Sequence, residues 1–247
     1  MKILAIQNRM GIGDMVIFLP FVEAISDNFN SPITLLVKES SKVKEYLNNN
    51  SKINQIIDLN RSNKKNGYHD GIFGFIRLAK ELKKHSFDKV FIFNSSLRYN
   101  LICKLAGIKE IYQYPLFKKK KQNIIEAAKS LLLNKLNIKV ESNPKIFLEK
   151  NLIQKAKIDF NFNNNKLNIL LGIGGSGPTK RMPAYKFKEF IKLVLNEYDC
   201  RFFLATGQEP EEQKILKEII LSYNEKCISL DKLRISEILP VIKNCRL

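Results

Sequence analysis

The chain has 247 residues, of which 45% are hydrophobic, and a formal net charge of +18. This length and apolar content suit one large domain or two small ones and argue against intrinsic disorder. No apolar run reaches the ~20 residues that a membrane-spanning helix requires, so the sequence predicts a soluble protein that is at most peripheral to a membrane. The positive charge is spread along the chain, and it favours an anionic substrate or bilayer surface as partner.

The cysteines and the N-terminus both indicate a cytoplasmic protein. The four cysteines are scattered, without Cys-x-x-Cys or Cys/His spacing, and are Cys103, Cys200, Cys227 and Cys245. We expect buried, reduced thiols. The apolar residues 1–6 form too short a segment for a signal peptide.

Short apolar strands alternate with amphipathic helices over residues 1–150. Strands are predicted over residues 3–6, 33–37, 56–59 and 90–93, and a fifth begins at residue 111. Helices are predicted over residues 15–28 (with a late start or a kink at Pro20), 43–47, 73–84, 97–106 and 124–136. In the helix 73–84, we expect Ile76, Ala79 and Leu82 to share one apolar face. The alternation predicts an α/β, Rossmann-like domain with a mostly parallel sheet covered on both faces.

A second α/β domain is predicted after a polar, Asn-rich linker over residues 151–166. In this domain, residues 167–247, strands are expected over 167–171, 201–205 and 227–229, and helices over 185–196, 211–221 and 235–243. These βα units make only half of a six-stranded doubly wound domain, so we expect the second domain to be incomplete.

A glycine-rich turn, Gly172 to Gly177, follows the first strand of this second domain and precedes Pro178, Thr179 and Lys180. Glycines let backbone N–H groups approach an anion, and the start of the next helix adds positive partial charge. The Thr179 hydroxyl and the Lys180 ammonium would add direct contacts to a phosphate. The stretch therefore predicts a binding site for a nucleotide diphosphate, in which Gly174, Gly175 and Ser176 also take part.

Two other phosphate-binding motifs match parts of this glycine-rich stretch. The six residues from Gly172 fit the GxGxxG dinucleotide fingerprint, but the prolines move the expected helix start to about Pro183. In that fingerprint an acid follows about 20 residues later, and the first plausible one here, Glu209, is much farther along. The Walker pattern fails because Pro178 stands where its Lys belongs. A glycine-rich turn without a ligand is the remaining alternative.

Three stretches resemble the lipopolysaccharide heptosyltransferases of glycosyltransferase family nine, and the likeness covers essentially the whole chain. They are the opening Ile3 to Pro20 with its Gly11-Ile12-Gly13-Asp14 turn, Gly174 to Pro183, and Thr206 to Glu209. The resemblance implies a GT-B fold, with two Rossmann-like domains facing a cleft. It also implies inverting transfer of a heptose from ADP-heptose to a growing core oligosaccharide, with the ADP-sugar as donor substrate and no cofactor.

The resemblance also implies roles for particular residues. Asp14 would be the catalytic base, Thr179 and Lys180 would bind the donor diphosphate, and Glu209, or the nearby Glu211, would hold the donor ribose. The chemistry agrees, because attack by a sugar hydroxyl needs a base and departure of ADP needs cationic stabilisation. No Asp-x-Asp pair is present to hold a metal ion. Helix capping is the alternative role for Asp14.

Basic residues of the first domain are the candidates for acceptor binding. The resembled family meets the acceptor's phosphates with a basic loop, which implies this role for Arg61, Lys64 and Lys65 between Asn60 and Asp70; a solvated loop is the alternative. Gly11, Gly13 and Arg98 complete the predicted acceptor side. Lys118 to Lys121 would contact acidic lipid headgroups of the inner membrane or remain solvated. The expected partners are thus a nucleotide-sugar donor, an anionic glycolipid and, peripherally, a membrane.

The end of the chain departs from the family, whose members continue past Leu247 with another strand and an Asp-x-Gly-x-x-His turn. We therefore expect a fragment whose second domain is loose and whose activity is in doubt. Two other functions remain open: a nicotinamide-dependent oxidoreductase that uses Gly172 to Gly177, and a basic nucleic-acid-binding protein. A helix starting at Ser176 would favour the oxidoreductase, and one starting near Pro183 would not.

Overall fold

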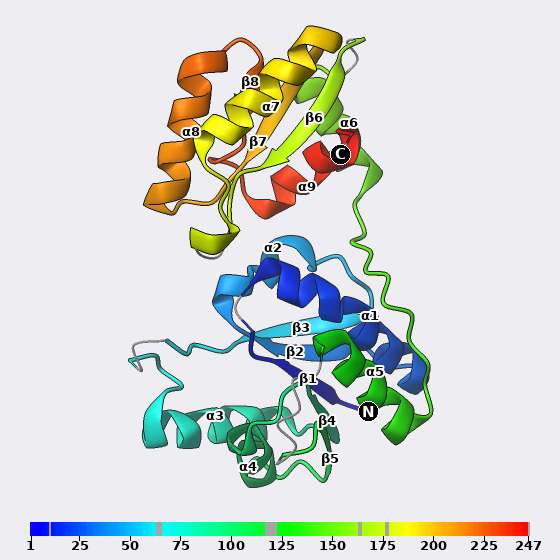
Figure 1. Ribbon diagram of the computed structural model, residues 1–247. Helices are drawn as coiled ribbons and strands as arrows, with labels where there is room; N and C mark the ends of the chain where they lie inside the picture. Colours follow the sequence, from blue (N-terminus) through cyan, green and yellow to red (C-terminus); the bar gives the residue numbers. More distant parts are fainter. Residues whose placement is uncertain (10, 63–65, 117–122, 163–164, 176–177, 247) are drawn as a thin grey trace. The chain divides into compact units, whose positions relative to one another are not determined.

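In the computed structural model the chain divides into two compact units, Met1–Phe147 and Leu148–Leu247 (Figure 1). The structure describes all residues except 10, 63–65, 117–122, 163–164, 176–177 and 247. The predicted linker is wrong over much of its length, because Lys150–Asp159 form helix α6 within the second unit. Its Ala156 belongs to that unit's core, together with the following Phe162.

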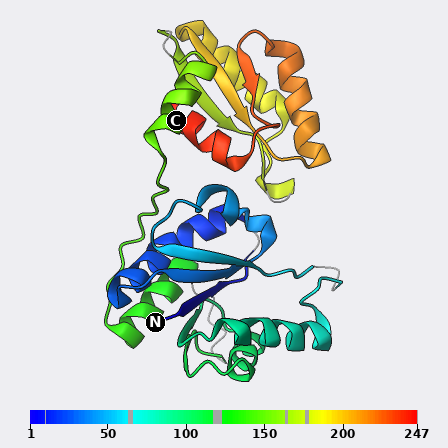
Figure 2. The same cartoon turned by 180° about the vertical axis from the view of Figure 1, so that it is seen from behind.

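Unit 1 is built on a parallel five-stranded sheet of order β3-β2-β1-β4-β5, as the alternating pattern predicts. Its strands are β1 (Ile3–Gln7), β2 (Ile33–Val37), β3 (Ile53–Asp58), β4 (Lys89–Ile92) and β5 (Glu110–Gln113). Its helices are α1 (Ile12–Phe29), η1 (Glu39–Ser41), α2 (Val43–Tyr46), α3 (Gly71–His85), α4 (Leu97–Leu105) and α5 (Ile124–Leu136). Helices α1 and α5 lie on one face of the sheet, and α3 and α4 lie on the other (Figures 1 and 2).

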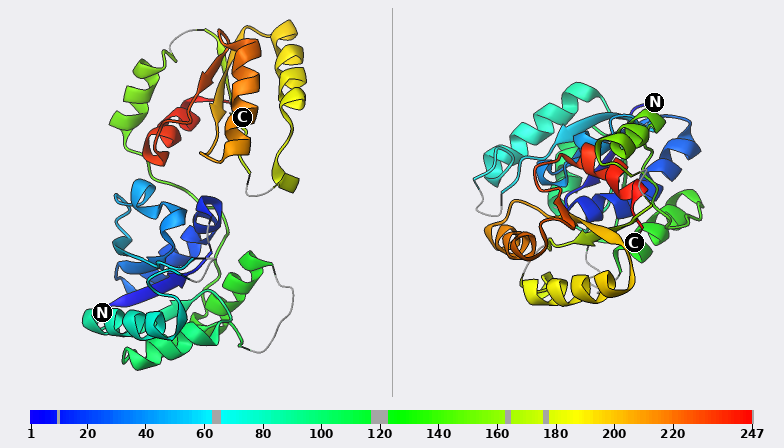
Figure 3. Two further views of the ribbon diagram at one scale, coloured as in Figure 1. Left: turned by 90° about the vertical axis from the view of Figure 1, so that its left-hand side faces the viewer. Right: turned by 90° about the horizontal axis from the view of Figure 1, so that it is seen from above.

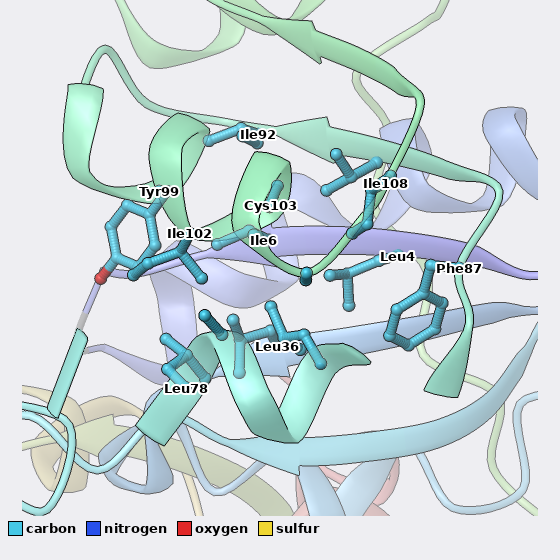
Figure 4. Packing of buried hydrophobic residues seen from close by; sticks show 14 of the residues in the cluster. Leu4, Ile6, Leu36, Leu78, Phe87, Ile92, Tyr99, Ile102, Cys103 and Ile108 are labelled. Atoms are coloured by element: carbon cyan, nitrogen blue, oxygen red, sulfur yellow. The ribbon is translucent and has the colours of Figure 1, made fainter. Parts of the chain in front are cut away.

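The sheet of unit 1 is buried on both faces, which explains why its central strands are continuously apolar. On the face covered by α3 and α4, Leu4 and Ile6 of β1 pack with Leu78 and Ile102 (Figure 4). Helix α1 runs without a break through Pro20 and begins at Ile12, three residues before the predicted start. Asp14 therefore lies inside the first helical turn.

Unit 2 has a parallel sheet of order β6-β7-β8. Its elements are β6 (Leu167–Gly172), η2 (Pro178–Lys180), α7 (Ala184–Glu197), β7 (Cys200–Ala205), α8 (Pro210–Tyr223), β8 (Cys227–Ser229) and α9 (Ile235–Asn244). Helices α7 and α8 cover one face, and α6 and α9 cover the other (Figure 3). Along β7 the side chains alternate: Phe202 and Leu204 join the α7/α8 core and Phe203 joins the α6/α9 core. Near the end of the chain, Arg246 forms a parallel bridge to Ile169 on the edge of β6 that does not pair with β7.

The cysteines are free thiols, and Cys103, Cys200 and Cys227 are buried, as predicted, whereas Cys245 is only partly buried. Burial raises the pKa of Cys103 to about 12 and that of Cys227 to about 11, so both thiols stay protonated at neutral pH. Within the described part of the chain, no helix is both long and apolar enough to cross a bilayer.

Candidate active site

A cavity lies at the carboxyl edge of the unit 1 sheet, between β1 and β4. The strand order reverses at this point, which is where open α/β sheets bind ligands. The cavity has a volume of about 790 Å³. Its walls come from the residues after β1 and β4, from the end of β5 and from α5, and include Asn8, Arg9, Phe93, Asn94, Ser95, Gln113, Tyr114, Ile124, Leu131, Asn134 and Lys135.

Two polar atoms in this wall are buried and have no partner among the described residues: Asn94 Nδ2 and Tyr114 Oη. Asn94 is held in place because its Oδ1 accepts a hydrogen bond from the Ser96 N–H at 2.9 Å. Burial raises the pKa of Tyr114, so its hydroxyl stays protonated and able to donate.

Asp14 caps helix α1 and also lies next to a residue of the cavity wall. Its Oδ2 accepts a hydrogen bond from the Gly11 N–H at 3.3 Å, and its Oδ1 lies 3.8 Å from Nη1 of Arg9, which lines the cavity. The Asp14 side chain is 32% exposed, so its carboxylate is accessible. Gly11 is the N-cap residue, and Gly13 is exposed within the first turn.

The loop before α3 is organised by Asp70, whose side chain is only 2% exposed. Its Oδ2 accepts hydrogen bonds from the N–H groups of Ser62 and Gly67, both at 2.9 Å, and its Oδ1 accepts one from Nε of Arg61 at 2.9 Å. The hydrogen bond from Ser62 and the Arg61 cation lower the pKa of Asp70 to about 2. The structure thus places Arg61 against Asp70, whereas Lys64 and Lys65 lie outside the described residues, as do Lys118 to Lys121.

Arg98 links the start of α4 to the start of α3. Its Nη2 donates to the carbonyl oxygens of His69 at 2.8 Å and Gly71 at 3.0 Å. Burial is the main cause that lowers the pKa of Arg98. His69 is itself buried: its Nδ1 accepts from the Asn60 N–H at 3.1 Å, so its proton is on Nε2, 3.1 Å from Glu81 Oε2. Arg98 therefore fixes a turn, a role that the sequence did not indicate.

In unit 2, the turns after β6 and β7 are joined by Glu212, which is 5% exposed. Glu212 Oε1 accepts from the Gly175 N–H at 2.8 Å, and Oε2 accepts from the Gly207 N–H at 2.9 Å. Arg181 completes the cluster, because its Nε donates to the Gly175 carbonyl at 2.9 Å and lies 3.6 Å from Glu212 Oε1. The Gly175 N–H is therefore taken by a carboxylate, whereas the sequence predicted that it faces a phosphate.

The glycines of these turns have a structural reason to lack side chains. A Cβ at Gly175 would lie 2.7 Å from the Lys180 carbonyl oxygen, and one at Gly207 would lie 2.6 Å from Glu212 Oε2. At Gly174 the nearest atom would be Glu212 Oε2, at 3.2 Å. The sequence pattern indicates Glu209 and Glu211 as candidates and does not single out Glu212. A useful signal was its place in the first turn of α8, where the helical period turns it toward the core while Glu211 stays exposed.

Thr179 and Lys180 are exposed on η2, between the carboxyl end of β6 and the start of α7. Helix α7 begins at Ala184 with Pro183 as its N-cap, which is the start that counts against the dinucleotide fingerprint. Ser176 lies outside the described residues. Glu209 is the exposed N-cap residue of α8 and makes no capping hydrogen bond through its side chain.

Comparisons with known proteins show the family and the fold of the chain. Residues 75–247 match the sequence model of glycosyltransferase family 9 (heptosyltransferase). ADP-heptose lipopolysaccharide heptosyltransferase II of Escherichia coli is similar over 99% of this chain and 77% of its own, with 16% identity and a TM-score of 0.72. A family 9 glycosyltransferase from Veillonella parvula is similar over 99% and 74%, with 18% identity and a TM-score of 0.76.

A third structure, E. coli heptosyltransferase WaaC with ADP-2-deoxy-2-fluoro heptose, is similar over 99% of this chain and 81% of its own. It shares 14% identity with this chain, and the TM-score is 0.68. No curated protein matches the chain. The structural likenesses confirm the predicted GT-B fold.

Proposed function

Because the chain belongs to glycosyltransferase family 9, the heptosyltransferase family, we propose that it transfers a heptose or a related sugar from an ADP-sugar to a lipopolysaccharide core or a similar glycan. Its class as a glycosyltransferase follows from the family. The proposed donor is supported by the ADP-heptose analogue in the structure of E. coli WaaC, which has the same fold.

The observation that carries the donor assignment is the exposure of Thr179 and Lys180 at the carboxyl edge of the unit 2 sheet. The Lys180 ammonium offsets the charge that develops on the diphosphate as ADP departs, and Thr179 donates a hydrogen bond to it. We propose that Lys180 takes this role without a metal cofactor. Glu209 or Glu211, both exposed at the start of α8, would accept hydrogen bonds from the donor ribose.

Asp14 is the proposed base. Its accessible carboxylate takes the proton from the acceptor hydroxyl as that oxygen attacks the anomeric carbon, and the bond to ADP breaks on the opposite face of the sugar. This displacement inverts the anomeric configuration. The Arg9 guanidinium lies 3.8 Å from this carboxylate and lines the cavity where we place the acceptor sugar.

The cavity supports a sugar ligand through the polar side chains in its wall, among them Asn8, Gln113 and Asn134. Phosphates of a glycolipid would lie toward Arg61, which keeps 32% of its side chain exposed although it pairs with Asp70. We include Lys64, Lys65 and Arg98 on this acceptor side as residues whose charge favours the same anionic ligand.

Thermal-shift measurements with ADP, UDP, GDP and NAD test the donor assignment. A ligand present at about 100 times its Kd stabilises the folded protein by about 2.7 kcal/mol, so a specific binder gives a clear rise in Tm. We expect ADP to give the largest shift. A larger shift with NAD would support an oxidoreductase instead, and no shift with any nucleotide would contradict the proposal. Mass spectrometry of a heptose-free core glycan incubated with ADP-heptose then tests the transfer itself.

A further inference from the structure

The outer side of helix α3 changes from apolar to basic along its length. Ile72 and Phe73, in its first turn, are 78% and 77% exposed, and Ile76, one turn later, is 42% exposed. Lys80, Lys83 and Lys84 continue on the same side and are exposed. At about 100° per residue these positions share one side of the helix. Within the described part of the chain, none of these lysines forms an ion pair with a carboxylate.

This pattern corrects the expectation that Ile76 is buried with Ala79 and Leu82. The inner side of α3 is formed by Leu78, Ala79 and Leu82, which pack into the core cluster (Figure 4). Sequence periodicity assigned Ile76 to this side because it precedes Ala79 by three positions. The helix instead presents Ile76 to solvent, beside Ile72.

The start of α3 is fixed, so its apolar side chains cannot turn inward. A Cβ at Gly74 would lie 2.2 Å from the carbonyl carbon of His69, which shows how closely the helix packs on the preceding turn. Arg98 holds the carbonyls of His69 and Gly71 from the side of α4. The apolar side chains therefore remain exposed to water, which is unfavourable in free energy. A surface that covered them would remove this free-energy cost.

An aromatic residue and another cation extend the same region. Tyr68 is 57% exposed, and the Arg77 guanidinium lies 4.8 Å above its ring. Tyrosine and cationic side chains are typical of the boundary between lipid headgroups and acyl chains. Because a helix that follows a parallel strand begins at the carboxyl edge of the sheet, the start of α3 lies at the same edge of unit 1 as Asp14. Figure 1 shows α3 on the outside of the unit.

We propose that this α3 face, formed by Tyr68, Ile72, Phe73, Ile76, Lys80, Lys83 and Lys84, docks on the surface of an anionic bilayer. The apolar first turn inserts among the lipids and the lysines contact acidic headgroups. A second copy of the chain is a poor occupant, because it would bring like-charged lysines together on a protein of net charge +18. The inference goes beyond sugar transfer and does not depend on the identity of the donor.

Fluorescence tests the insertion directly, because the chain contains no tryptophan. Phe73→Trp places one fluorophore in the middle of the face, and we expect its emission to shift to shorter wavelength with vesicles of phosphatidylethanolamine and phosphatidylglycerol. Leu221→Trp is the control, since Leu221 is 86% exposed on α8 in unit 2 and should show no shift. No shift at Phe73→Trp, or a shift without vesicles that grows with protein concentration, would overturn the proposal.

Vesicle co-sedimentation then separates the α3 face from the diffuse charge of the protein. We expect Ile72→Ser with Phe73→Ser, and separately Lys80→Glu with Lys83→Glu and Lys84→Glu, to lower binding by about tenfold or more. The matched controls are Leu221→Ser and the equal charge change at exposed lysines of unit 2, Lys192→Glu with Lys214→Glu and Lys217→Glu. Equal losses in the controls would show that the α3 face has no special role.

ADP affinity is measured on every variant, and we expect it to be unchanged. Normal vesicle binding without ADP binding would contradict the donor assignment and leave the docking face intact. Normal ADP binding without vesicle binding would overturn the docking face alone.

Discussion

Glu212 accepts a hydrogen bond from the Gly175 N–H at 2.8 Å, and this contact fixes the glycine turn after β6 to helix α8. The second carboxylate oxygen takes the Gly207 N–H from the turn after β7. The two turns at the carboxyl edge of the unit 2 sheet therefore share one buried anchor. The carbonyl oxygen of Lys180 packs closely against Gly175. Because Glu212 holds Gly175, it also helps to position Lys180 and the phosphate site that we propose there.

Replacing this anchor should destabilise unit 2 and weaken nucleotide binding. Glu212→Ala leaves two backbone N–H groups and Arg181 without their carboxylate, which we expect to lower the free energy of unfolding by about 3 kcal/mol. ADP affinity should fall as well, because the turn loses its fixed conformation. Urea unfolding and calorimetry measure the two effects.

The control for this change is Glu211→Ala, at the exposed neighbouring position, which should alter stability by less than about 0.5 kcal/mol. Glu212→Gln keeps one acceptor oxygen and should lie between the two. Equal stability of the Glu212→Ala and Glu211→Ala proteins would show that the buried carboxylate contributes nothing.

Lys180→Ala should weaken ADP binding by about 1.5–3 kcal/mol, the range for a hydrogen bond to a charged group. The side chain is exposed, so the Tm without ligand should change little. Isothermal titration calorimetry measures the affinity. Lys192→Ala, at an exposed position on α7, is the control for general charge. An unchanged Kd for Lys180→Ala would remove this residue from the donor site.

Asp14→Asn separates catalysis from helix capping. The amide oxygen can still accept the hydrogen bond from the Gly11 N–H, but it cannot take a proton, so kcat should fall by about 10²–10⁴ while ADP affinity stays the same. Asp27→Asn, at the exposed end of the same helix, is the control and should keep its turnover. If Asp14→Asn keeps normal kcat and only melts earlier, capping is its whole role.

Asp70 should make unit 1 sensitive to acid. Its folded-state pKa, about 2, lies below the ordinary value because the Ser62 N–H and Arg61 favour the ionised form. The stability it contributes is complete above the ordinary pKa of about 3.9 and is lost as the pH falls from there toward 2. Denaturation of wild type and Asp70→Asn should differ most above about pH 4 and converge at lower pH. A difference independent of pH would show that the carboxylate charge is not responsible.

Apart from α6, the sequence by itself determined the order of the main strands and helices, because continuous apolar runs and helical periods are local signals. It also located the glycine-rich turn after β6, since glycine permits turn conformations and proline cannot continue a helix. The strand Ile33–Val37 and the helix Ile124–Leu136 have the predicted bounds. The sequence motifs around Asp14 and Lys180 were enough to indicate glycosyltransferase family 9, which the comparison with family models shows.

Only the tertiary structure decided which polar residues serve ligands and which serve the fold. The acids Glu209, Glu211 and Glu212 look alike in sequence, and the rotation of α8 against β7 turns only Glu212 inward. The region predicted as a linker forms α6 because its few apolar groups are buried by α9, which comes about 80 residues later in the chain. Ile76 is exposed for a similar reason: a helical period gives relative positions, but the partner against which a helix packs decides which side becomes the core.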